Sequence, residues 1–366
     1  MKITKIEAIP FVIPYRPDVG SSRWSSGGVE KADHVLIKVH GEDGLVGYGE
    51  AMPRPVFYGE SQRSIVVAVD EFYRQPLLGM EVMDAEKISQ VLDRYPGNHT
   101  ARGALDVAIH DLKARFLGIP LHQLLGGWHK GRIPVAASIA LKDKVEPMVA
   151  DSLKFVETGV KTLKVKVGVD PKKDVELIRA LRKAVGERID IYVDANQGWD
   201  RRQALWALPR MVDEGVFMVE EPLSVSDLEG RLLIAKTIPI LILMDESVMT
   251  VSDVARELRV GAVGRINVKT PRTGIMNSQR IIRAAEMFHI PCIIGTQAET
   301  GVGTIASGHN GAAYRNVVNS ELANYLKWGD DILVEKPKFE DGFLILPPGP
   351  GLGIEIDPEK LAKYRV

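Results

Sequence analysis

The pattern of apolar and polar positions changes near residue 130. Beyond that point, eight short runs rich in β-branched residues start roughly 22 to 29 residues apart, with helical patterns between them. Each interval leaves room for one crossover helix, and right-handed βα units in this number close into a barrel. The runs cover residues 133–141, 162–168, 190–196, 217–222, 240–247, 262–270, 291–297 and 316–322.

This spacing predicts an α/β fold built on a (β/α)7β-type TIM barrel. A doubly wound open sheet is the structural alternative. The count of eight runs favours the barrel, and so does the lack of a Gly-rich dinucleotide-binding loop after the first run.

The first third of the chain has an α+β pattern. Strands are predicted over residues 2–15 and, around a Gly-Glu-Asp-Gly turn, within 34–51. Helices are predicted over roughly 61–75, 84–94 and 100–117. A Ser/Gly-rich segment, 15–28, predicts a mobile loop. We expect an N-terminal domain of residues 1–127, to which residues 330–366 return, and a barrel domain of residues 128–329.

Composition narrows the class of partner. The 47 basic and 48 acidic residues give a net charge of -1, which argues against nucleic acid or an anionic membrane as the main partner. No apolar run approaches about 18 residues, so no membrane span is expected. The single cysteine, Cys292, indicates a reducing compartment, and residues 1–15 lack a signal-peptide core. We expect a soluble, cytoplasmic globular protein.

Acidic residues end three consecutive predicted strands. They are Asp194, Glu220 with Glu221, and Asp245 with Glu246, and the first residues of these groups lie 26 and 25 residues apart. Each acid alone is explained as a helix N-cap or a solvated loop residue. Three carboxylates at one rim of a barrel need a compensating charge, and oxygen-only ligands suit Mg²⁺, with Mn²⁺ as a substitute.

Lysines accompany these acids. Lys164 and Lys166 share one face of the second predicted strand, where burial and mutual repulsion would lower a lysine pKa. A solvated face of an edge strand is the alternative. Lys269 ends the sixth strand, across the barrel mouth, and Glu299 follows the seventh. Two opposed lysines and a divalent cation suit removal of a proton α to a carboxylate, because the resulting enediolate needs an electrophile.

Motifs over nearly the whole chain resemble the mandelate racemase/muconate lactonizing enzyme family of the enolase superfamily, specifically its muconate lactonizing subgroup. They are LGIPLHQLLGG (117–127), KVKVG (164–168), DANQGW (194–199), VEEP (219–222), MDES (244–247), NVKT (267–270), GTQAETGVGTIASGH (295–309) and PGLGIEID (350–357).

The resemblance implies a role for each matching residue. Asp194, Glu220 and Asp245 would be metal ligands, Lys166 and Lys269 opposed acid/base residues, and Lys164 a partner of the substrate carboxylate. Asn196 and Glu299 match positions near the metal and substrate. Glu221 and Glu246 adjoin ligand positions, and alternation predicts that they point away from their neighbours and support them.

The resemblance also implies that the N-terminal domain caps the barrel with two specificity loops. These would be residues 15–30, with Arg23 and Trp24, and residues 52–60, with Arg54, Phe57 and Tyr58. An aromatic side chain from either loop could cover an apolar or cationic group of the substrate. The alternative for Trp24 is an anchor that packs the loop on its own domain.

The predicted activity is that of a Mg²⁺-dependent isomerase that abstracts the proton α to a carboxylate to give a metal-stabilised enediolate. A racemase or epimerase of an amino-acid derivative is the leading hypothesis, and a muconate-type cycloisomerase or an acid dehydratase is the alternative. Residues 319–326, NSELANYL, lack the Asp-x-Asp of dipeptide epimerases and are closer to the Glu-Leu of cycloisomerases. A Schiff-base aldolase barrel would leave the three acids without a partner, and the intact ligands and bases argue against an inactive binding protein. A homo-oligomer is expected.

Overall fold

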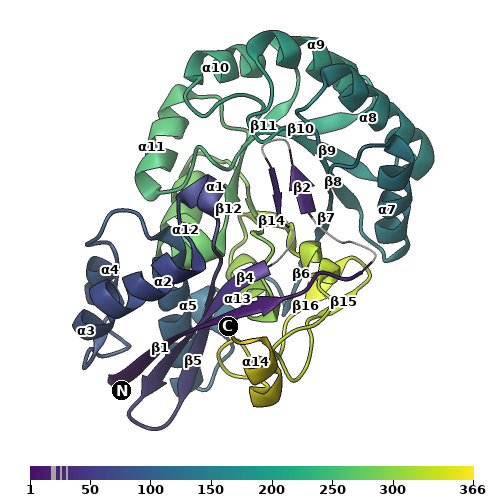
Figure 1. Ribbon diagram of the computed structural model, residues 1–366. Helices are drawn as coiled ribbons and strands as arrows, with labels where there is room; N and C mark the ends of the chain where they lie inside the picture. The colour runs from purple at the N-terminus through teal and green to yellow at the C-terminus, as the bar shows by residue number, and fades with distance from the viewer. Residues whose placement is uncertain (18–21, 25–26, 30–31) are drawn as a thin grey trace.

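The computed structural model describes residues 1–17, 22–24, 27–29 and 32–366. For residues 22–24, 27–29 and 32 it describes only the backbone. Helices surround a central parallel sheet, and an N-terminal sheet with its own helices lies against one side of them (Figure 1). The predicted α/β fold, a TIM-barrel-like sheet with an N-terminal capping domain, is confirmed.

The central sheet, within the described residues, has eight parallel strands that are hydrogen-bonded in chain order. Val135, just before the first strand, forms a parallel bridge with Ser320 at the end of the last, which brings the two edges of the sheet together. The strands are β7 (Ala136–Ile139), β8 (Thr162–Lys166), β9 (Asp190–Asp194), β10 (Val216–Glu220), β11 (Leu241–Met244), β12 (Arg265–Val268), β13 (Cys292–Ile294) and β14 (Val317–Ser320).

A crossover helix follows each of the first seven strands of this sheet in the described chain, as the (β/α)7β prediction requires. The helices are α7 (Val145–Glu157), α8 (Pro171–Val185), α9 (Arg201–Val212), α10 (Leu228–Thr237), α11 (Val251–Val260), α12 (Thr270–Met287) and α13 (Gly301–Ala312). After β14 the chain forms a 3-10 helix, η2 (Leu322–Lys327).

Separate residues cap the helices that follow the acidic strand ends. The side chain of Asp200 accepts a hydrogen bond from the Gln203 N–H (2.7 Å) at the start of α9, and Asp227 does the same for α10. Thr250 caps α11. The strand-end acids are therefore not needed as N-caps, and the N-cap alternative for them is wrong.

Alternation along the strands separates two faces of the sheet. Tyr192, Met218 and Leu243 belong to a small apolar cluster inside the barrel. Their strand neighbours, such as Val193, belong to the large core between the sheet and the helices. Since residues two positions apart share a face, the side chains that follow the inner layer at the strand ends also point to the barrel axis.

The capping domain is built on a three-stranded antiparallel sheet in the order β1 (Ile3–Ile13), β4 (Ala32–Gly41), β5 (Val46–Ala51). Its helices confirm the predicted ones, with the first divided into α2, a π-helical turn and α3. They are α1 (Pro55–Tyr58), α2 (Gln62–Ala68), η1 (Val69–Tyr73), α3 (Arg74–Leu77), α4 (Ala85–Leu92), α5 (His99–Phe116) and α6 (Leu121–Leu125).

The segment 15–28 differs from the loop that was expected. Where the structure describes it, the backbone forms two short antiparallel strands, β2 (Ser22–Trp24) and β3 (Gly27–Val29). The prediction of a loop is therefore wrong for residues 22–24, 27 and 28, and positions 18–21 and 25–26 of the segment lie outside the described residues.

Helix α5 lies between the capping sheet and the barrel. A Cβ atom on Gly47 or Gly49 of β5 would collide with backbone oxygens of α5, and a Cβ on Gly103 of α5 would collide with the Pro271 carbonyl of α12. These close approaches show why glycine is required at both contacts, and they bring the cap backbone directly onto the sixth barrel helix.

Two buried carboxylates of the cap also bind the barrel. Asp106 accepts hydrogen bonds from the N–H groups of Ile275 (2.5 Å) and Met276 (2.8 Å) on α12. Glu50 accepts from the Thr300 N–H (2.8 Å) and hydroxyl (2.7 Å) at the start of α13. Charged acceptors at buried N–H groups make strong hydrogen bonds, so the cap is fixed at two adjacent barrel units.

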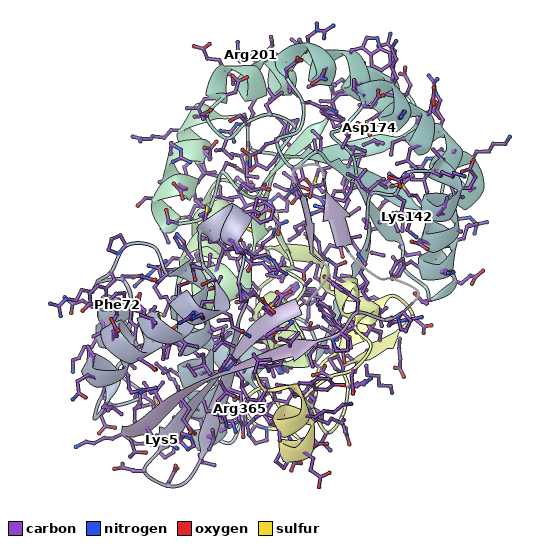
Figure 2. The ribbon with its side chains drawn as sticks, viewed as in Figure 1. Lys5, Phe72, Lys142, Asp174, Arg201 and Arg365 are labelled. Atoms are coloured by element: carbon purple, nitrogen blue, oxygen red, sulfur yellow. The ribbon has the colours of Figure 1, made fainter. Side chains whose placement is uncertain are left out.

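The C-terminal segment contacts both parts of the molecule. β15 (Lys338–Glu340) and β16 (Phe343–Ile345) form a small sheet with β6 (Arg132–Pro134), which lies just before the barrel. Beyond α14 (Pro358–Tyr364), Arg365 forms a bridge with Phe11 of β1 (Figure 2). The predicted domain boundaries at residues 127 and 329 stay a prediction.

The helices of the described ranges are all either too short or too polar to cross a lipid bilayer.

We expect Gly49→Ala to destabilise the protein by at least about 1–3 kcal/mol, because its Cβ would press on the backbone of α5. Urea unfolding followed by circular dichroism measures the change. Gly41→Ala, on the neighbouring strand, is the matched control, because its Cβ would meet the flexible ends of Met1 and Asp43. Equal unfolding free energies for the two variants would contradict the close packing described here.

Candidate functional site

A cavity of about 90 Å³ lies at the carboxyl ends of the barrel strands, under residues of the cap. This central cavity is the place where TIM barrels carry their active sites. It is lined from the barrel by Ser138, Ala140, Lys166, Asn196, Asp245, Glu246, Lys269, Thr296, Gln297, Ala298 and Asn324, and from the cap by Tyr15, Arg54, Phe57 and Tyr58.

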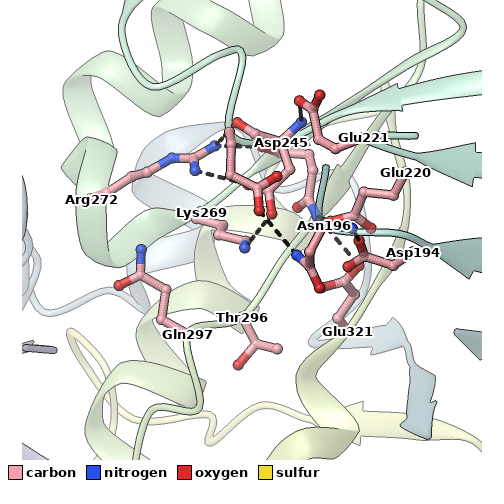
Figure 3. Close-up of polar contacts among 12 residues, drawn as sticks. Asp194, Asn196, Glu220, Glu221, Asp245, Lys269, Arg272, Thr296, Gln297 and Glu321 are labelled. Carbon is pink, nitrogen blue, oxygen red and sulfur yellow. Dashed lines mark hydrogen bonds and ion pairs between the residues drawn. The ribbon is translucent and has the colours of Figure 1, made fainter. Parts of the chain in front are cut away.

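Strand register brings the predicted polar residues to one level. Lys166 pairs with Asp194, and Asp194 pairs with Glu220, along β8, β9 and β10. Figure 3 shows Asp194 and Glu220 on one side of the site and Asp245, with its two cationic partners, on the other.

The Lys164 ammonium lies among three carboxylates. Its Nζ is 2.9 Å from Asp194, 2.6 Å from Glu220 and 2.8 Å from Glu321. Burial opposes the charged form, but the carboxylates outweigh it and raise the pKa of Lys164 well above its usual value. The predicted lowering of a lysine pKa is therefore wrong for Lys164, because acids rather than Lys166 dominate its surroundings.

Lys166 faces the cavity and contacts two of the predicted residues. Its Nζ donates to Asp194 Oδ2 (2.5 Å) and Asn196 Oδ1 (2.7 Å). Burial alone would raise the pKa of Asp194, but the charges of Lys164 and Lys166 lower it to about 2. Asp194 is thus an anion shared by both lysines of the Lys-x-Lys motif.

Glu321 is a site residue that the sequence interpretation missed. Its Oε1 accepts hydrogen bonds from the Tyr192 hydroxyl (2.8 Å), Lys164 and, at 3.3 Å, the amide of Asn267. The signal was available, because Glu321 directly follows the eighth predicted strand.

Asp245 is held by two cations. It contacts Lys269 Nζ, and its Oδ1 accepts from Arg272 Nη1 at 2.8 Å. Burial would raise the pKa of Asp245, but these two charges lower it far below its usual value. Arg272 also donates to the backbone carbonyls of Asp245, Val248 and Asn267. Arg272 was missed too, and its place in the first turn of α12, three residues after Lys269, gave no clear signal.

Alternation predicts that Glu246 points away from its neighbours, but its side chain points into the site. It lines the central cavity with Asp245 and accepts a hydrogen bond from Asn196 Nδ2 (3.0 Å). Alternation fails here because β11 ends at Met244, before both acids. Burial, followed by the charges of Asp245 and Glu221, raises the pKa of Glu246 to about 8.

Glu221 supports the loop that carries Asp245. Its Oε1 accepts from the N–H groups of Asp245 (2.8 Å) and Ser247 (2.9 Å) and from the Ser247 hydroxyl (2.5 Å). Its Oε2 lies 3.7 Å from Nη1 of the buried Arg231. The expectation that Glu221 points away from its neighbours is confirmed.

Glu299 is buried beneath the cavity rather than lining it. Its Oε2 accepts from the Gln297 N–H (2.9 Å) and contacts the Thr296 hydroxyl. Thr296 and Gln297 do line the cavity. Glu299 therefore shapes the wall of the cavity through its neighbours.

The second predicted cap loop reaches the cavity. Gln297 Nε2 donates to the Tyr58 hydroxyl, and Arg54 donates to the Gln297 carbonyl. Burial, outweighing the nearby cations, raises the pKa of Tyr58. The side chains of Arg23 and Trp24, from the first loop, lie outside the described residues.

The acids at the strand ends supply oxygen donors, the type of ligand that a hard divalent cation prefers. No group of three or more His, Cys, Asp or Glu side chains in the described part of the chain surrounds a common point. Asp194 and Glu220 nevertheless converge on one cationic nitrogen, that of Lys164, and Glu220 Oε2 has no well-directed hydrogen bond. Asp245 follows the end of β11, the strand that pairs with β10. All three supply only oxygen, the ligand that Mg²⁺ prefers.

Comparison with protein families gives two matches that together span most of the chain. Residues 11–126 match the model described as "Mandelate racemase / muconate lactonizing enzyme, N-terminal domain". Residues 148–360 match the model described as "Enolase C-terminal domain-like".

Individual relatives are similar along their full length. The chain is 33% identical to an L-Ala-D/L-Glu epimerase of Clostridium acetobutylicum, covering 95% of this chain and 96% of that protein. It is 32% identical to a chloromuconate cycloisomerase of Pseudomonas sp. (strain P51), covering 98% and 99%. Among solved structures, a muconate lactonizing enzyme from "Mucobacterium Smegmatis" complexed with muconolactone has a TM-score of 0.96 and 38% identity, covering 100% of both chains.

We expect Arg272→Met to destabilise the protein by about 3–5 kcal/mol, because it leaves Asp245 buried beside unpaired carbonyls. Urea unfolding measures this loss. Arg179→Met, which removes the partner of Glu214 in an exposed ion pair, should change stability by less than about 1 kcal/mol. A similarly small effect for Arg272→Met would show that Asp245 does not depend on it.

Proposed function

The chain belongs to the mandelate racemase/muconate lactonizing enzyme family, and on that premise we propose that it is an isomerase that moves the proton α to the carboxylate of a small acid. One observation carries the proposal. Lys166 and Lys269 line the same small cavity from β8 and from the end of β12, strands that lie four positions apart among the eight.

The two lysines would act as base and acid in turn. The unprotonated amine of one accepts the α-proton, and the electron pair of the C–H bond moves into the carboxylate. The ammonium of the other then donates a proton to the opposite face of the same carbon. Lys164, buried among carboxylates beneath the cavity, would supply positive charge near the substrate carboxylate.

Asp194, Glu220 and Asp245 would hold a divalent cation, Mg²⁺ or Mn²⁺, at the carboxyl ends of their strands. When bound there, the cation would supply electrostatic stabilisation for the negative charge that develops on the substrate carboxylate. Arg272 and Glu221 would fix the Asp245 loop, and Glu321 would hold Lys164 in place.

The remaining predicted residues would position these groups. Asn196 bridges Lys166 and Glu246, and Glu299 supports the 296–297 wall. From the cap, Tyr58 would contact the substrate and exclude water.

A racemase or epimerase of an N-substituted amino acid is the activity we place first. Racemisation uses both lysines, whereas a single base would suffice for a one-sided proton transfer. The strand-eight segment offers one carboxylate, Glu321, which Lys164 occupies, and Ala323 stands where a second acid would follow. A free substrate ammonium would therefore lack an acidic partner there.

Cycloisomerisation of a muconate-type diacid is the second candidate. Its support is the similarity to the muconolactone-bound enzyme over the whole chain. In that case one lysine would act on the α-carbon, and the other would support the charge of the intermediate. Dehydration of a hydroxy acid would use the same residues, with one lysine protonating the leaving hydroxyl.

Assembly and location are proposed from the sequence and one surface feature. Trp128 (56% exposed), Met287 (80%) and Phe288 (57%) present large apolar side chains to solvent. Such side chains support a homo-oligomer. The single cysteine, which is buried, supports a reducing compartment such as the cytoplasm.

Exchange of the α-proton in D2O separates the roles of the two lysines. With a panel of N-acyl amino acids, Lys166→Ala should lose net isomerisation but retain exchange on one enantiomer. Lys269→Ala should retain exchange on the other, because each variant keeps the base on one face. Proton NMR of both enantiomers measures the rates.

Lys161→Ala, an exposed lysine just before β8, is the control for these variants and should exchange both enantiomers like the wild type. If one lysine variant loses exchange on both enantiomers and the other loses none, the enzyme has a single base. The cycloisomerase or dehydratase then becomes the better description.

Chelation tests the cation. Exhaustive dialysis against EDTA should abolish α-exchange, and added Mg²⁺ should restore it, because three carboxylates would otherwise lack their counter-ion. Asp245→Asn should need more Mg²⁺ for half-maximal exchange than the wild type. Full activity of the dialysed protein would rule out the metal-dependent mechanism.

A further inference from the structure

Lys269 and Arg272, the two cations that hold Asp245, both lie at the start of α12 (Figure 3). This start is a separate helical turn. Gly274 has a φ of 66° and a ψ of −162°, outside the helical region, and it divides α12 into a short turn, 270–273, and a longer helix. The direction of the short turn is therefore not set by the rest of α12, and other contacts must fix it.

Asp106 of α5 binds the start of the longer helix. Its Oδ2 accepts hydrogen bonds from the N–H groups of Ile275 (2.5 Å) and Met276 (2.8 Å), the first two residues after Gly274. The first N–H groups of a helix have no partner within that helix, so a carboxylate from the cap serves as the N-cap here. A Cβ atom on Gly274 would collide with the same carboxylate oxygen, so the contact requires glycine.

The short turn 270–273 also contacts α5 directly. Gly103 lies three residues before Asp106, and a Cβ atom on it would collide with the Pro271 carbonyl. From the barrel, the side-chain amide of Asn310 on α13 donates to the Thr270 hydroxyl (3.0 Å). The cap helix therefore contacts α12 on both sides of the break and holds the turn together with a barrel helix.

His110 keeps the Asp106 carboxyl group charged. Its Nδ1 lies 3.1 Å from Asp106 Oδ1, and both side chains are buried. Burial alone would raise the pKa of Asp106, but His110 and the two backbone N–H groups lower it. Burial likewise opposes the charged form of His110, but Asp106 outweighs it and raises the pKa of His110. An ionised acceptor makes stronger hydrogen bonds than a neutral one, which strengthens the contact with α12.

We propose that Asp106 is a positioning residue for the reaction in the central cavity: from the cap, it fixes the turn that places Lys269 and Arg272 at the cavity. This rests on the proposed function of that cavity. It adds that one of the two opposed lysines depends on the capping domain for its position.

This dependence on the cap distinguishes the two lysines. Lys166 ends β8, and its side-chain hydrogen bonds go to Asp194 and Asn196, at the end of the neighbouring barrel strand. Its position is set by the barrel sheet itself. Lys269, in contrast, is followed by the turn that Asp106 fixes. Loss of Asp106 should therefore displace one of the proton-transferring groups and leave the other in place.

Exchange of the α-proton in D2O, with Mg²⁺ present, separates this role from a general loss of stability. The enantiomer whose exchange survives in Lys166→Ala reports on Lys269, and the other enantiomer reports on Lys166. Asp106→Asn keeps one acceptor oxygen and should slow the Lys269-dependent exchange by about 10-fold. Asp106→Ala keeps none and should slow it by about 100-fold, because small displacements of a reacting group cost this much. The Lys166-dependent exchange should stay within about 2-fold in both variants.

Asp111→Asn is the matched control. Asp111 is another buried carboxylate on α5, and it also accepts hydrogen bonds from two backbone N–H groups. These belong to Tyr48 of β5 (2.8 Å) and to Leu352 of the C-terminal segment (2.6 Å). Asp106→Asn and Asp111→Asn should both be less stable to urea than the wild type, but only Asp106→Asn should change the ratio of the two exchange rates.

Amide hydrogen exchange of the peptide 269–278, followed by mass spectrometry, tests the same role without turnover. Asp106→Asn should speed the exchange of this peptide by about 10-fold, because two of its N–H groups lose a charged acceptor. Asp111→Asn should leave it within about 2-fold. Circular dichroism confirms that each variant is folded.

The two measurements separate this inference from the proposed function. If the wild type exchanges both enantiomers and the Asp106 variants slow both equally or neither, the isomerase stands and the positioning role is wrong. If the wild type does not exchange both enantiomers, the two-lysine isomerase fails and the peptide 269–278 decides alone. Faster amide exchange in Asp106→Asn but not in Asp111→Asn then supports the positioning role, and unchanged exchange overturns it.

Discussion

Buried carboxylates and buried cations share the space above the apolar layer of the barrel, and each sign is tolerated because the other is present. Asp194 and Glu220 lie against Lys164, and Asp245 lies against Lys269 and Arg272. Removing charges of one sign would leave the others desolvated and unpaired, at a cost of several kcal/mol. This compensation holds the proposed acid/base lysines, the proposed cation ligands and the loops between them in one arrangement.

The cap contributes to that arrangement through buried polar contacts rather than through surface packing alone. Glu50 and Asp106 bind the starts of two barrel helices, and the 52–60 loop reaches the central cavity through Tyr58 and Arg54. Because the cap is fixed at α12 and α13, the 52–60 loop meets the barrel mouth in a defined position. A cavity of about 90 Å³ then leaves little room for bulk water around a reacting carbon.

Two neighbouring cavities at the barrel mouth are built from different structural elements. The lysines and acids come from β8 to β12, on the inner face of the sheet. A neighbouring cavity of about 330 Å³ is formed by the end of β7, by α7, by the segment after β14 and by the first residues of the cap.

The sequence by itself determined the strand count, the placement of acids and lysines at strand ends, and the inner face of each strand, because strand alternation and βα spacing are local properties. Tertiary structure alone decided which groups meet. Lys164 and Glu321 are 157 residues apart and touch only because the first and last strands of the barrel come together. Glu246 turned towards the cavity because the strand ends before it, where alternation no longer applies.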